Sequence, residues 1–304
     1  MNISKIRTAI KLLKTPSRMI LPLGQNGHLG WIPDDKYLKL VYRCETGQKL
    51  NLNNPVTFSE KLQWLKLHDR NPEYCSLVDK YLMKGIVAER IGAEYVIPLL
   101  GVWDRAEDID FDALPNRFVL KCNHDSGGVV ICRNKNKLDR EAARTKLKTH
   151  LERDAYIPSR EWPYRDVHRV VFAEELLETS EGEDLIDYKF YCFSGKPTYC
   201  QVIKDRSTRE TIDFYDADWN LQPFTGLGLG EGFPHGLKTP EPDNYEKMLE
   251  IAREFSRGTR FSRIDMYNIG GRIYFGEFTL YPKSGLGYFL PEEWNIKIGD
   301  MLEL

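Results

Sequence analysis

Residues 118–132 read FVLKCNHDSGGVVIC, two apolar runs that flank a short polar loop with two glycines at its end. The alternation predicts a pair of β-strands, because neighbouring side chains of a strand point to opposite faces. If Phe118, Leu120 and Cys122 face a core, Lys121 faces the other side, beside the loop. Small residues let backbone N–H groups approach a phosphate, and the lysine adds a charge. The stretch predicts either a phosphate-binding loop or an ordinary hairpin turn with one surface lysine.

The loop matches neither of the two common glycine-rich nucleotide motifs. It lacks the GxxxxGK[ST] pattern of P-loops and the GxGxxG pattern of dinucleotide-binding folds. Other parts of the chain must therefore decide between the two interpretations.

A second predicted hairpin, RIDMYNIGGRIYFGEFTLYP at 263–282, contributes two acidic side chains. Asp265 and Glu277 lie in apolar surroundings, where a lone carboxylate is unfavourable. Adjacent carboxylates repel unless a cation bridges them, and oxygen ligands of this kind suit Mg²⁺. The alternative is a pair of solvated strand acids near Arg263. Direct opposition of the two acids requires a five-residue connection, whereas a tighter turn at 268–271 requires a bulge.

The composition is that of an ordinary globular protein. The 304 residues are 41 % hydrophobic and 29 % charged. The net charge is −2, so the protein has no excess of positive charge that would favour binding to nucleic acid. No run approaches the roughly 20 apolar residues of a membrane-spanning helix. The length fits one large domain or two to three packed subdomains.

The cysteines and the N-terminus bear on cellular location. The six cysteines contain no CxxC pair and several alternate with apolar residues, so we expect small buried side chains in a reducing, cytoplasmic compartment. The basic residues 1–22 form a poor secretory signal. Their isoleucines fall at helical spacing, which fits either a helix docked on the protein or a helix on a membrane surface. A membrane-peripheral location therefore stays open.

The rest of the chain predicts an α+β fold dominated by antiparallel strands. Helices are expected at 57–70, 75–92, 139–153 and 244–258. The first begins with the capping-box pattern Thr57-x-x-Glu60, and Gly92 fits the C-cap of the second. Strands are expected at 95–103, 118–123, 129–133, 169–177, 187–206 (a hairpin), 213–221 and 263–282. We expect three regions, namely a helix-rich region 1–93, a subdomain with the glycine loop at 94–177 and a subdomain with the metal-binding hairpin at 178–304.

The order of these motifs resembles the ATP-grasp enzymes. The resemblance rests on Asp79-Lys80, VLKxxxxxSGG, AEELL and RxD…ExT…P, in that order. DYKFYCFSGKP and GEFTLYPKSG are similar to the teichuronopeptide-biosynthesis (TupA-like) branch in particular, and the resemblance covers roughly residues 55–300. It implies two α+β subdomains whose antiparallel sheets enclose a nucleotide cleft, preceded by a helix-rich region.

The resemblance also implies a nucleotide-binding set. Lys80 and Lys121 would contact the ATP phosphates, and the loop at 125–128 would cover the β- and γ-phosphates. Glu174 would meet the adenine amino group, and the following backbone would complete the hinge. The residues expected to bind nucleotide are Lys80, Lys121, Asp125, Ser126, Gly127, Gly128, Glu174, Glu175, Leu177 and Lys189.

On the metal side, the resemblance implies that Asp265 and Glu277 hold one or two Mg²⁺ ions. The family commonly has an asparagine where this chain has Thr279, whose hydroxyl ligates or orients a metal more weakly. Arg263 would stabilise the negative charge of the acyl phosphate. Arg263 and Lys121 are the candidate catalytic residues. Lys283 and Ser284 either touch the substrate carboxylate or only form a turn.

The implied activity is that of an ATP-dependent carboxylate–amine ligase that forms an amide through an acyl phosphate. Its substrates would belong to bacterial surface polysaccharide synthesis, for example a uronic acid joined to an amino acid or amine. A kinase or a glycosyltransferase is one alternative, since Asp216-Ala217-Asp218 has the spacing of a DxD metal motif, although we expect a turn there. A non-catalytic nucleotide-binding scaffold is the other.

Overall fold

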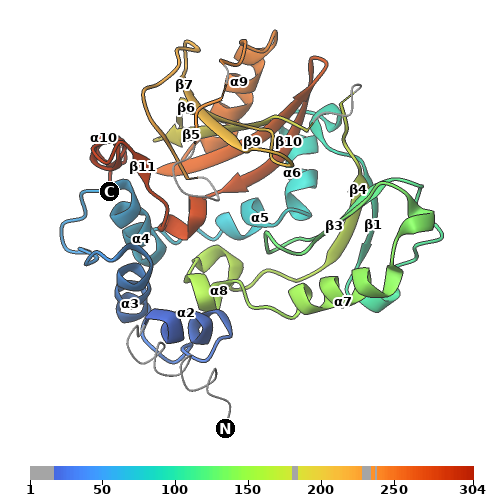
Figure 1. The fold of residues 1–304 in the computed structure, drawn as a ribbon, viewed down its shortest axis with the longest axis horizontal. Helices are drawn as coiled ribbons and strands as arrows, with labels where there is room; N and C mark the ends of the chain where they lie inside the picture. Colours follow the sequence, from blue (N-terminus) through green and yellow to red (C-terminus); the bar gives the residue numbers. More distant parts are fainter. Residues whose placement is uncertain (1–16, 180–183, 228–233, 237) are drawn as a thin grey trace.

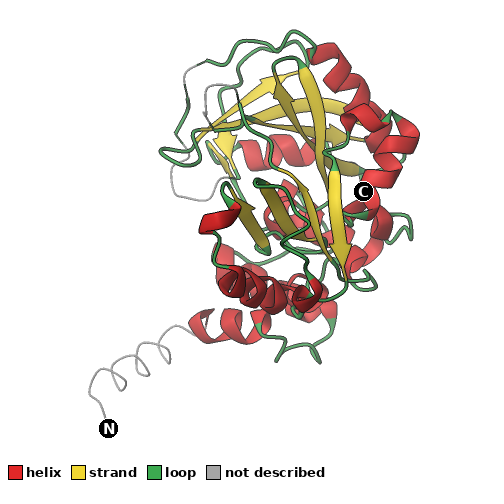
Figure 2. Ribbon diagram, turned by 90° about the vertical axis from the view of Figure 1, so that its right-hand side faces the viewer, coloured by secondary structure: helices red, strands yellow, loops and turns green. Residues whose placement is uncertain are grey.

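The computed structural model describes residues 17–179, 184–227, 234–236 and 238–304, and it places its two larger antiparallel sheets in two lobes (Figure 1). Most helices lie around the strands (Figure 2). The predicted α+β class is therefore confirmed. Among the described residues no helix is both long and apolar enough to cross a membrane. The N-terminal helix predicted from the isoleucine spacing lies outside the described residues up to position 16.

The smaller sheet contains the first hairpin. Its four strands lie in the order β1-β4-β2-β3, with bounds β1 (Leu99–Trp103), β2 (Phe118–Cys122), β3 (Val129–Cys132) and β4 (Val171–Glu175). Phe118, Leu120 and Cys122 belong to a buried core that includes residues of α7 (Arg140–Leu151). Lys121 is only partly buried and faces the space between the two sheets. The alternation predicted for this stretch is confirmed.

The larger sheet carries the second hairpin. Its five strands lie in the order β10-β9-β5-β6-β7, with bounds β5 (Asp187–Phe193), β6 (Lys196–Lys204), β7 (Thr211–Asp216), β9 (Phe261–Ile269) and β10 (Arg272–Thr279). Helix α9 (Tyr245–Ser256) packs on β5, β6 and β9 through its apolar side, where Tyr245 stacks on Phe190. The buried Cys192 and Cys200 pack in this core, as the alternation predicts.

Three helices of the N-terminal half pack on the larger sheet. They are α4 (Phe58–His68), α5 (Tyr74–Val78) and α6 (Leu82–Arg90). The predicted capping box is confirmed, because the Thr57 hydroxyl accepts the Glu60 N–H at 3.2 Å and the Glu60 carboxylate accepts the Thr57 N–H at 3.1 Å.

The single helix predicted at 75–92 is interrupted between α5 and α6. The Asp79 carboxylate accepts the N–H groups of Tyr81 and Leu82 at 2.9 and 3.1 Å. An aspartate that bonds to nearby backbone in this way ends one helix and starts the next, and the periodicity of apolar residues does not register such a break. Lys80 lies in the turn that results.

The remaining elements complete the two lobes. They are α2 (Ser17–Gln25), α3 (Asp34–Thr46), α8 (Tyr156–Ser159), α10 (Trp294–Asp300), β8 (Thr225–Gly226) and β11 (Phe289–Leu290). Helices α2 and α3 lie beside α8 at one end of the molecule (Figure 1). The guanidinium of the buried Arg160 joins them, since it lies 4.1 Å from the Tyr37 ring and 3.1 Å from the Asp34 carboxylate.

The turn of the second hairpin decides the register of its two acids. The turn is tight, with Ile269 opposite Arg272 and with positive φ angles at Gly270 and Gly271. Asp265 nevertheless lies directly opposite Glu277, because the register shifts between Phe275 and Glu277. The prediction that a tighter turn requires a bulge is confirmed. The bulge is what brings the two carboxylates side by side.

Candidate active site

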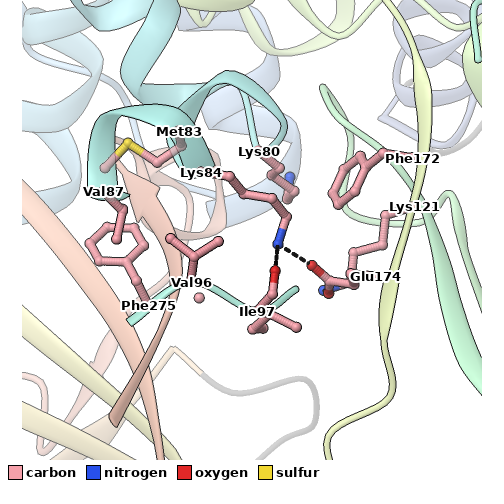
Figure 3. Close-up of a pocket in the computed structure, with 11 residues that line it drawn as sticks. Lys80, Met83, Lys84, Val87, Val96, Ile97, Lys121, Phe172, Glu174 and Phe275 are labelled. Carbon is pink, nitrogen blue, oxygen red and sulfur yellow. Dashed lines mark hydrogen bonds and ion pairs between the residues drawn. The ribbon is translucent and has the colours of Figure 1, made fainter. Parts of the chain in front are cut away.

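A cavity lies between the two sheets. Lys121, Phe172 and Glu174 line it from the smaller sheet, and Phe275 lines it from β10 (Figure 3), next to Gly276. Its other lining residues come from the turn before α6, from α6 itself and from the segment before β1: Lys80, Met83, Lys84, Val87, Val96 and Ile97. The cavity combines apolar walls with three lysines, as a site for a flat ring with attached phosphates would require.

Glu174 lies between two of these lysines. It is 3 % exposed, and its two oxygens pair with the ammonium groups of Lys84, at 2.7 Å, and Lys121. Burial works to raise the pKa of Glu174, but the two ammonium groups outweigh burial and hold it below its usual range. Lys84 also donates to the Ile97 carbonyl at 2.8 Å (Figure 3). The contact with the adenine amino group predicted for Glu174 would have to share oxygens that are already engaged.

The predicted glycine loop, Asp125–Gly128, folds back on itself. The Asp125 carboxylate accepts the N–H groups of Gly127 and Gly128 at 3.0 and 2.6 Å, and its second oxygen lies 2.5 Å from Nδ1 of His150. A Cβ on Gly127 would lie 2.6 Å from the His150 ring, and one on Gly128 would lie 2.7 Å from Sγ of Cys122. Both glycines are therefore required by packing, and their N–H groups are engaged within the loop.

Lys80 connects the glycine loop to the second hairpin. Its Nζ donates to the Asp125 carbonyl at 3.0 Å and lies 3.8 Å from Oε2 of Glu277. Two fully buried neighbours fix its backbone: the Lys80 N–H donates to the Asn123 carbonyl at 3.1 Å, and the Asn123 side chain donates to Asp79 at 2.8 Å. Sequence reasoning missed Lys84 and Asn123, although the spacing of Lys80 and Lys84 is a helical one.

The two carboxylates of the second hairpin share one guanidinium. Arg263 donates to Asp265 at 2.6 and 2.8 Å, to Glu277 at 3.0 Å and to the Thr279 hydroxyl at 3.2 Å. The ammonium of Lys189 pairs with Asp265 as well. Burial works to raise the pKa of Glu277, but Lys80, Arg263 and Lys189 together hold it well below its usual range. The structure thus brings together the residues that the sequence predicted for this side of the site.

The carboxylate pair fits Mg²⁺ only in combination with other oxygen ligands. Asp265, Glu277 and the Thr279 hydroxyl, 3.2 Å from a Glu277 oxygen, offer oxygen donors alone, which Mg²⁺ prefers. In the part of the chain that the structure describes, no group of three or more His, Cys, Asp or Glu side chains could hold a metal ion. Phosphate oxygens and water would have to complete the shell, as is usual for Mg²⁺ in nucleotide sites.

The other predicted residues lie at the edges of this region. Glu175 ends β4 with an exposed side chain, while its N–H donates to the Pro98 carbonyl at 3.0 Å. Leu177 follows it, partly buried. Lys283 and Ser284 form a turn after β10, and the Ser284 hydroxyl accepts a bond from Lys66 at 2.9 Å.

The Asp216-Ala217-Asp218 sequence is a turn, as predicted. The Asp216 carboxylate accepts the N–H groups of Asp218 and Asn220 at 3.0 and 2.8 Å. It therefore closes its own turn at the end of β7, which is the ordinary role of an aspartate at such a position.

Comparisons with solved structures find distant similarities to ATP-grasp proteins. A D-alanine–D-alanine ligase from Bacillus anthracis complexed with ATP has a TM-score of 0.43 and 18 % identity, over 75 % of this chain and 63 % of that chain. The chain thus spans just under two thirds of that ligase. A D-alanine–D-alanine ligase from Helicobacter pylori has a TM-score of 0.40 and 13 % identity, over 81 % and 68 %. A RimK domain ATP-grasp protein from Sphaerobacter thermophilus DSM 20745 has a TM-score of 0.39 and 14 % identity, over 82 % of this chain and 72 % of that chain.

Sequence comparisons are decisive for the family. No curated protein matches the chain. The family model described as TupA-like ATPgrasp matches residues 60–303, which is most of the chain and includes both hairpins. The chain belongs to the TupA-like ATPgrasp family.

Proposed function

We propose that the protein is an ATP-dependent carboxylate–amine ligase. ATP would phosphorylate a substrate carboxylate, and an amine would then displace the phosphate to give an amide. The observation that carries the proposal is the convergence of Lys80 and Lys121 in one cavity, with Glu277 only 3.8 Å from the Lys80 ammonium. A cleft that joins phosphate-binding cations to a carboxylate pair is what transfer of a phosphoryl group requires.

The nucleotide would lie in the cavity between the sheets. Its apolar walls, Val96, Ile97 and Phe172 among them, suit the adenine ring. Lys80 and Lys121 would then contact the phosphates, which requires Lys121 to exchange its bond to Glu174 for a phosphate oxygen. This exchange leaves every charge paired, so it costs less free energy than burying an unpaired ion.

The glycine loop would cover the phosphates only after a rearrangement. Its two glycine N–H groups now face the Asp125 carboxylate, and a phosphate can compete for them as an anion of the same kind. The Asp125–His150 contact anchors the loop in its present conformation. Nucleotide binding would therefore change the loop before it changes the strands on either side.

Asp265, Glu277 and Thr279 would hold Mg²⁺, which would neutralise phosphate charge when bound. Arg263 already lies on both carboxylates and would stabilise the negative charge that develops during transfer. Lys189, which pairs with Asp265, would keep that carboxylate in place. Lys189 would also be a further contact to the phosphates or the ribose. The protein's contribution is thus positioning and charge neutralisation.

The reaction would proceed in two steps. A carboxylate oxygen of the acid attacks the γ-phosphorus of ATP, which gives an acyl phosphate and ADP. The nitrogen of the amine then attacks the acyl carbon, the C–O bond to phosphate breaks, and inorganic phosphate leaves as the nitrogen loses a proton. Exclusion of water from the cavity would protect the acyl phosphate from hydrolysis. The acid and amine would belong to a bacterial surface polysaccharide, for example a uronic acid and an amino acid.

The test is ADP release from MgATP with D-glucuronate and a panel of amino acids and amines. We expect ADP, phosphate and a condensation product only when both an acid and an amine are present. Asp265→Asn should lower the rate by at least about 100-fold, as expected for loss of a transition-state charge contact. Asp216→Asn, the same change in the turn of β7, should leave it within about 2-fold. ADP release without an amine would indicate a kinase, and transfer from a UDP-sugar without ATP, lost in Asp216→Asn, would indicate a glycosyltransferase.

A further inference from the structure

The turn after β10 is left-handed over three consecutive residues. Lys283 (φ 52°, ψ 32°) and Ser284 (φ 54°, ψ 29°) precede Gly285 (φ 64°). For residues other than glycine this conformation is unfavourable, because Cβ comes too close to the following carbonyl oxygen. Backbone strain of this kind persists only where the surroundings impose it, and it gathers at functional sites. The surroundings of this turn should therefore show what imposes it.

One face of α4 supplies the restraint. Ser59, Gln63 and Lys66, spaced four and three residues apart, are 7 %, 1 % and 1 % exposed and lie on one side of the helix. We call these three side chains the polar rail. A helix face packed inside a protein is normally apolar, so three buried polar residues in one row need partners.

Each side chain of the polar rail donates to the left-handed turn. The Ser59 hydroxyl donates to the Gly285 carbonyl at 2.5 Å, and Gln63 donates to the Ser284 and Gly285 carbonyls at 2.9 and 2.8 Å. Lys66 donates to the carbonyl and the hydroxyl of Ser284, both at 2.9 Å. Four hydrogen bonds thus fix the two carbonyls whose direction defines the turn, and a fifth holds the Ser284 hydroxyl.

Lys66 has a further bond that ties the turn to a third segment. Its ammonium donates to the Ser159 carbonyl at 2.8 Å, at the end of α8. Burial lowers the pKa of Lys66 to about 8, while the nearby Glu161 carboxylate opposes the shift. Burial of a lysine is unfavourable unless its ammonium group is hydrogen-bonded. The three hydrogen bonds of Lys66 meet this need and fix both the turn and the end of α8.

The turn places Lys283 near cationic groups of the proposed reaction centre. Lys283 follows Thr279 by four residues, and its ammonium interacts electrostatically with the Glu210 carboxylate and with the cationic side chains of Arg263, Arg206 and Lys189. Within the described ranges no acidic side chain lies at ion-pair distance from Lys283. Lys283, Arg263 and Lys189 thus form a cluster of cations beside the proposed reaction centre, to which a substrate anion can bind.

We propose that Ser59, Gln63 and Lys66 are positioning residues that hold the turn left-handed, so that Lys283 binds the carboxylate of the acid substrate next to the reaction centre. A turn with ordinary negative φ angles would point the Cα–Cβ bond of Lys283 in another direction. The identity of the anion rests on the proposed function. The restraint of the turn by α4 rests on the hydrogen bonds alone.

The first experiment compares the polar rail with a matched lysine on the same helix. Lys61 donates to the Gly299 and Leu302 carbonyls, both at 2.8 Å, and so holds α10 rather than the turn. Gln63→Leu and Lys66→Met should raise the KM for D-glucuronate, the acid used in the ligase assay, at least 10-fold with little change in kcat or in the Kd of ADP. Lys61→Met should lower the melting temperature and leave that KM within 2-fold.

A double-mutant cycle then tests whether the rail acts through Lys283. Lys283→Met should raise the KM for the acid at least 10-fold, and adding Gln63→Leu should change it by less than 2-fold. Independent effects that multiply would overturn the positioning role.

A third arm needs no substrate. Acetylation of Lys283 by sulfo-NHS-acetate, followed by mass spectrometry, should change in rate by more than 3-fold in Gln63→Leu and Lys66→Met but not in Lys61→Met. If both rail variants fail to fold, Ser59→Ala, which removes one bond, replaces them in all arms. A changed labelling rate without any ligase activity would refute the proposed function and keep the positioning role. Labelling equal to that of Lys61→Met would overturn the positioning role.

Discussion

Replacement of Arg263 by methionine is the sharpest test of the charge arrangement at the second hairpin. The guanidinium makes bonds of 2.6 and 2.8 Å to Asp265 and of 3.0 Å to Glu277, and it is the group that both carboxylates share. Methionine keeps a similar length and removes the charge and all the donors. The two carboxylates would then face each other across the strands without the cation between them.

The size of the loss in the free energy of unfolding depends on the ion pairs that remain in Arg263→Met. Removing one partner of a buried ion pair costs about 3–5 kcal/mol, because the other partner is left uncompensated. Lys189 still pairs with Asp265, and Lys80 still lies 3.8 Å from Glu277, so the lower end of this range applies. We expect Arg263→Met to lower the free energy of unfolding by about 3 kcal/mol. In a chain of this size each kcal/mol lowers the melting temperature by about 2 °C, which gives about 6 °C.

The assay is urea unfolding at pH 7 of the wild type, Arg263→Met and an exposed control. Arg253→Met removes an arginine that pairs with Glu246 on the surface at 3.0 Å, a kind of pair that contributes less than about 1 kcal/mol. Adding Glu277→Gln to Arg263→Met should recover about 1 kcal/mol, since it removes one of the uncompensated charges. A loss no larger than that of Arg253→Met, or a double variant that is strictly additive, would refute the reasoning.

Three further predictions concern the neighbouring groups. Asn123→Ala should lower the free energy of unfolding by about 1–3 kcal/mol in urea unfolding, because the buried Asp79 carboxylate loses a donor; an unchanged midpoint would contradict this. The pKa of Glu277 is depressed, since Lys80 and its other cationic neighbours outweigh burial, so the stability it contributes is present above about pH 4.5 and is lost as the pH falls. Glu277→Gln should flatten that acid limb in a melting-temperature series, and an unchanged slope would count against it. His150→Ala should speed hydrogen exchange of the glycine-loop amides at least about 5-fold, and equal rates would show that the ring does not anchor the loop.

The sequence predicts local structure well where one helix or hairpin decides it. Apolar alternation around Lys121 gave the right faces for the first hairpin, and the tight glycine turn correctly required a bulge before Glu277. The capping box at Thr57 also formed as predicted. Each of these features depends on residues close together in the chain, so the pattern alone carries the information.

The sequence predicts less where distant segments meet. The break before α6 arises from the Asp79 side chain, and the engaged N–H groups of the glycine loop arise from Asp125, so both reflect side-chain bonds that periodicity cannot register. The contacts of Gln63 with Ser284 span 221 positions, and nothing local to either residue indicates them. Lys84 was missed because its partner, Glu174, lies on a strand of the other lobe.

The most direct test of the central claim is a crystal structure with Mg²⁺ and a non-hydrolysable ATP analogue. The account predicts adenine against Phe172 in the cavity, phosphates between Lys80 and Lys121, and Mg²⁺ on Asp265 and Glu277. An analogue bound on another surface, or a cavity that stays empty at millimolar analogue while the protein is folded, would contradict it.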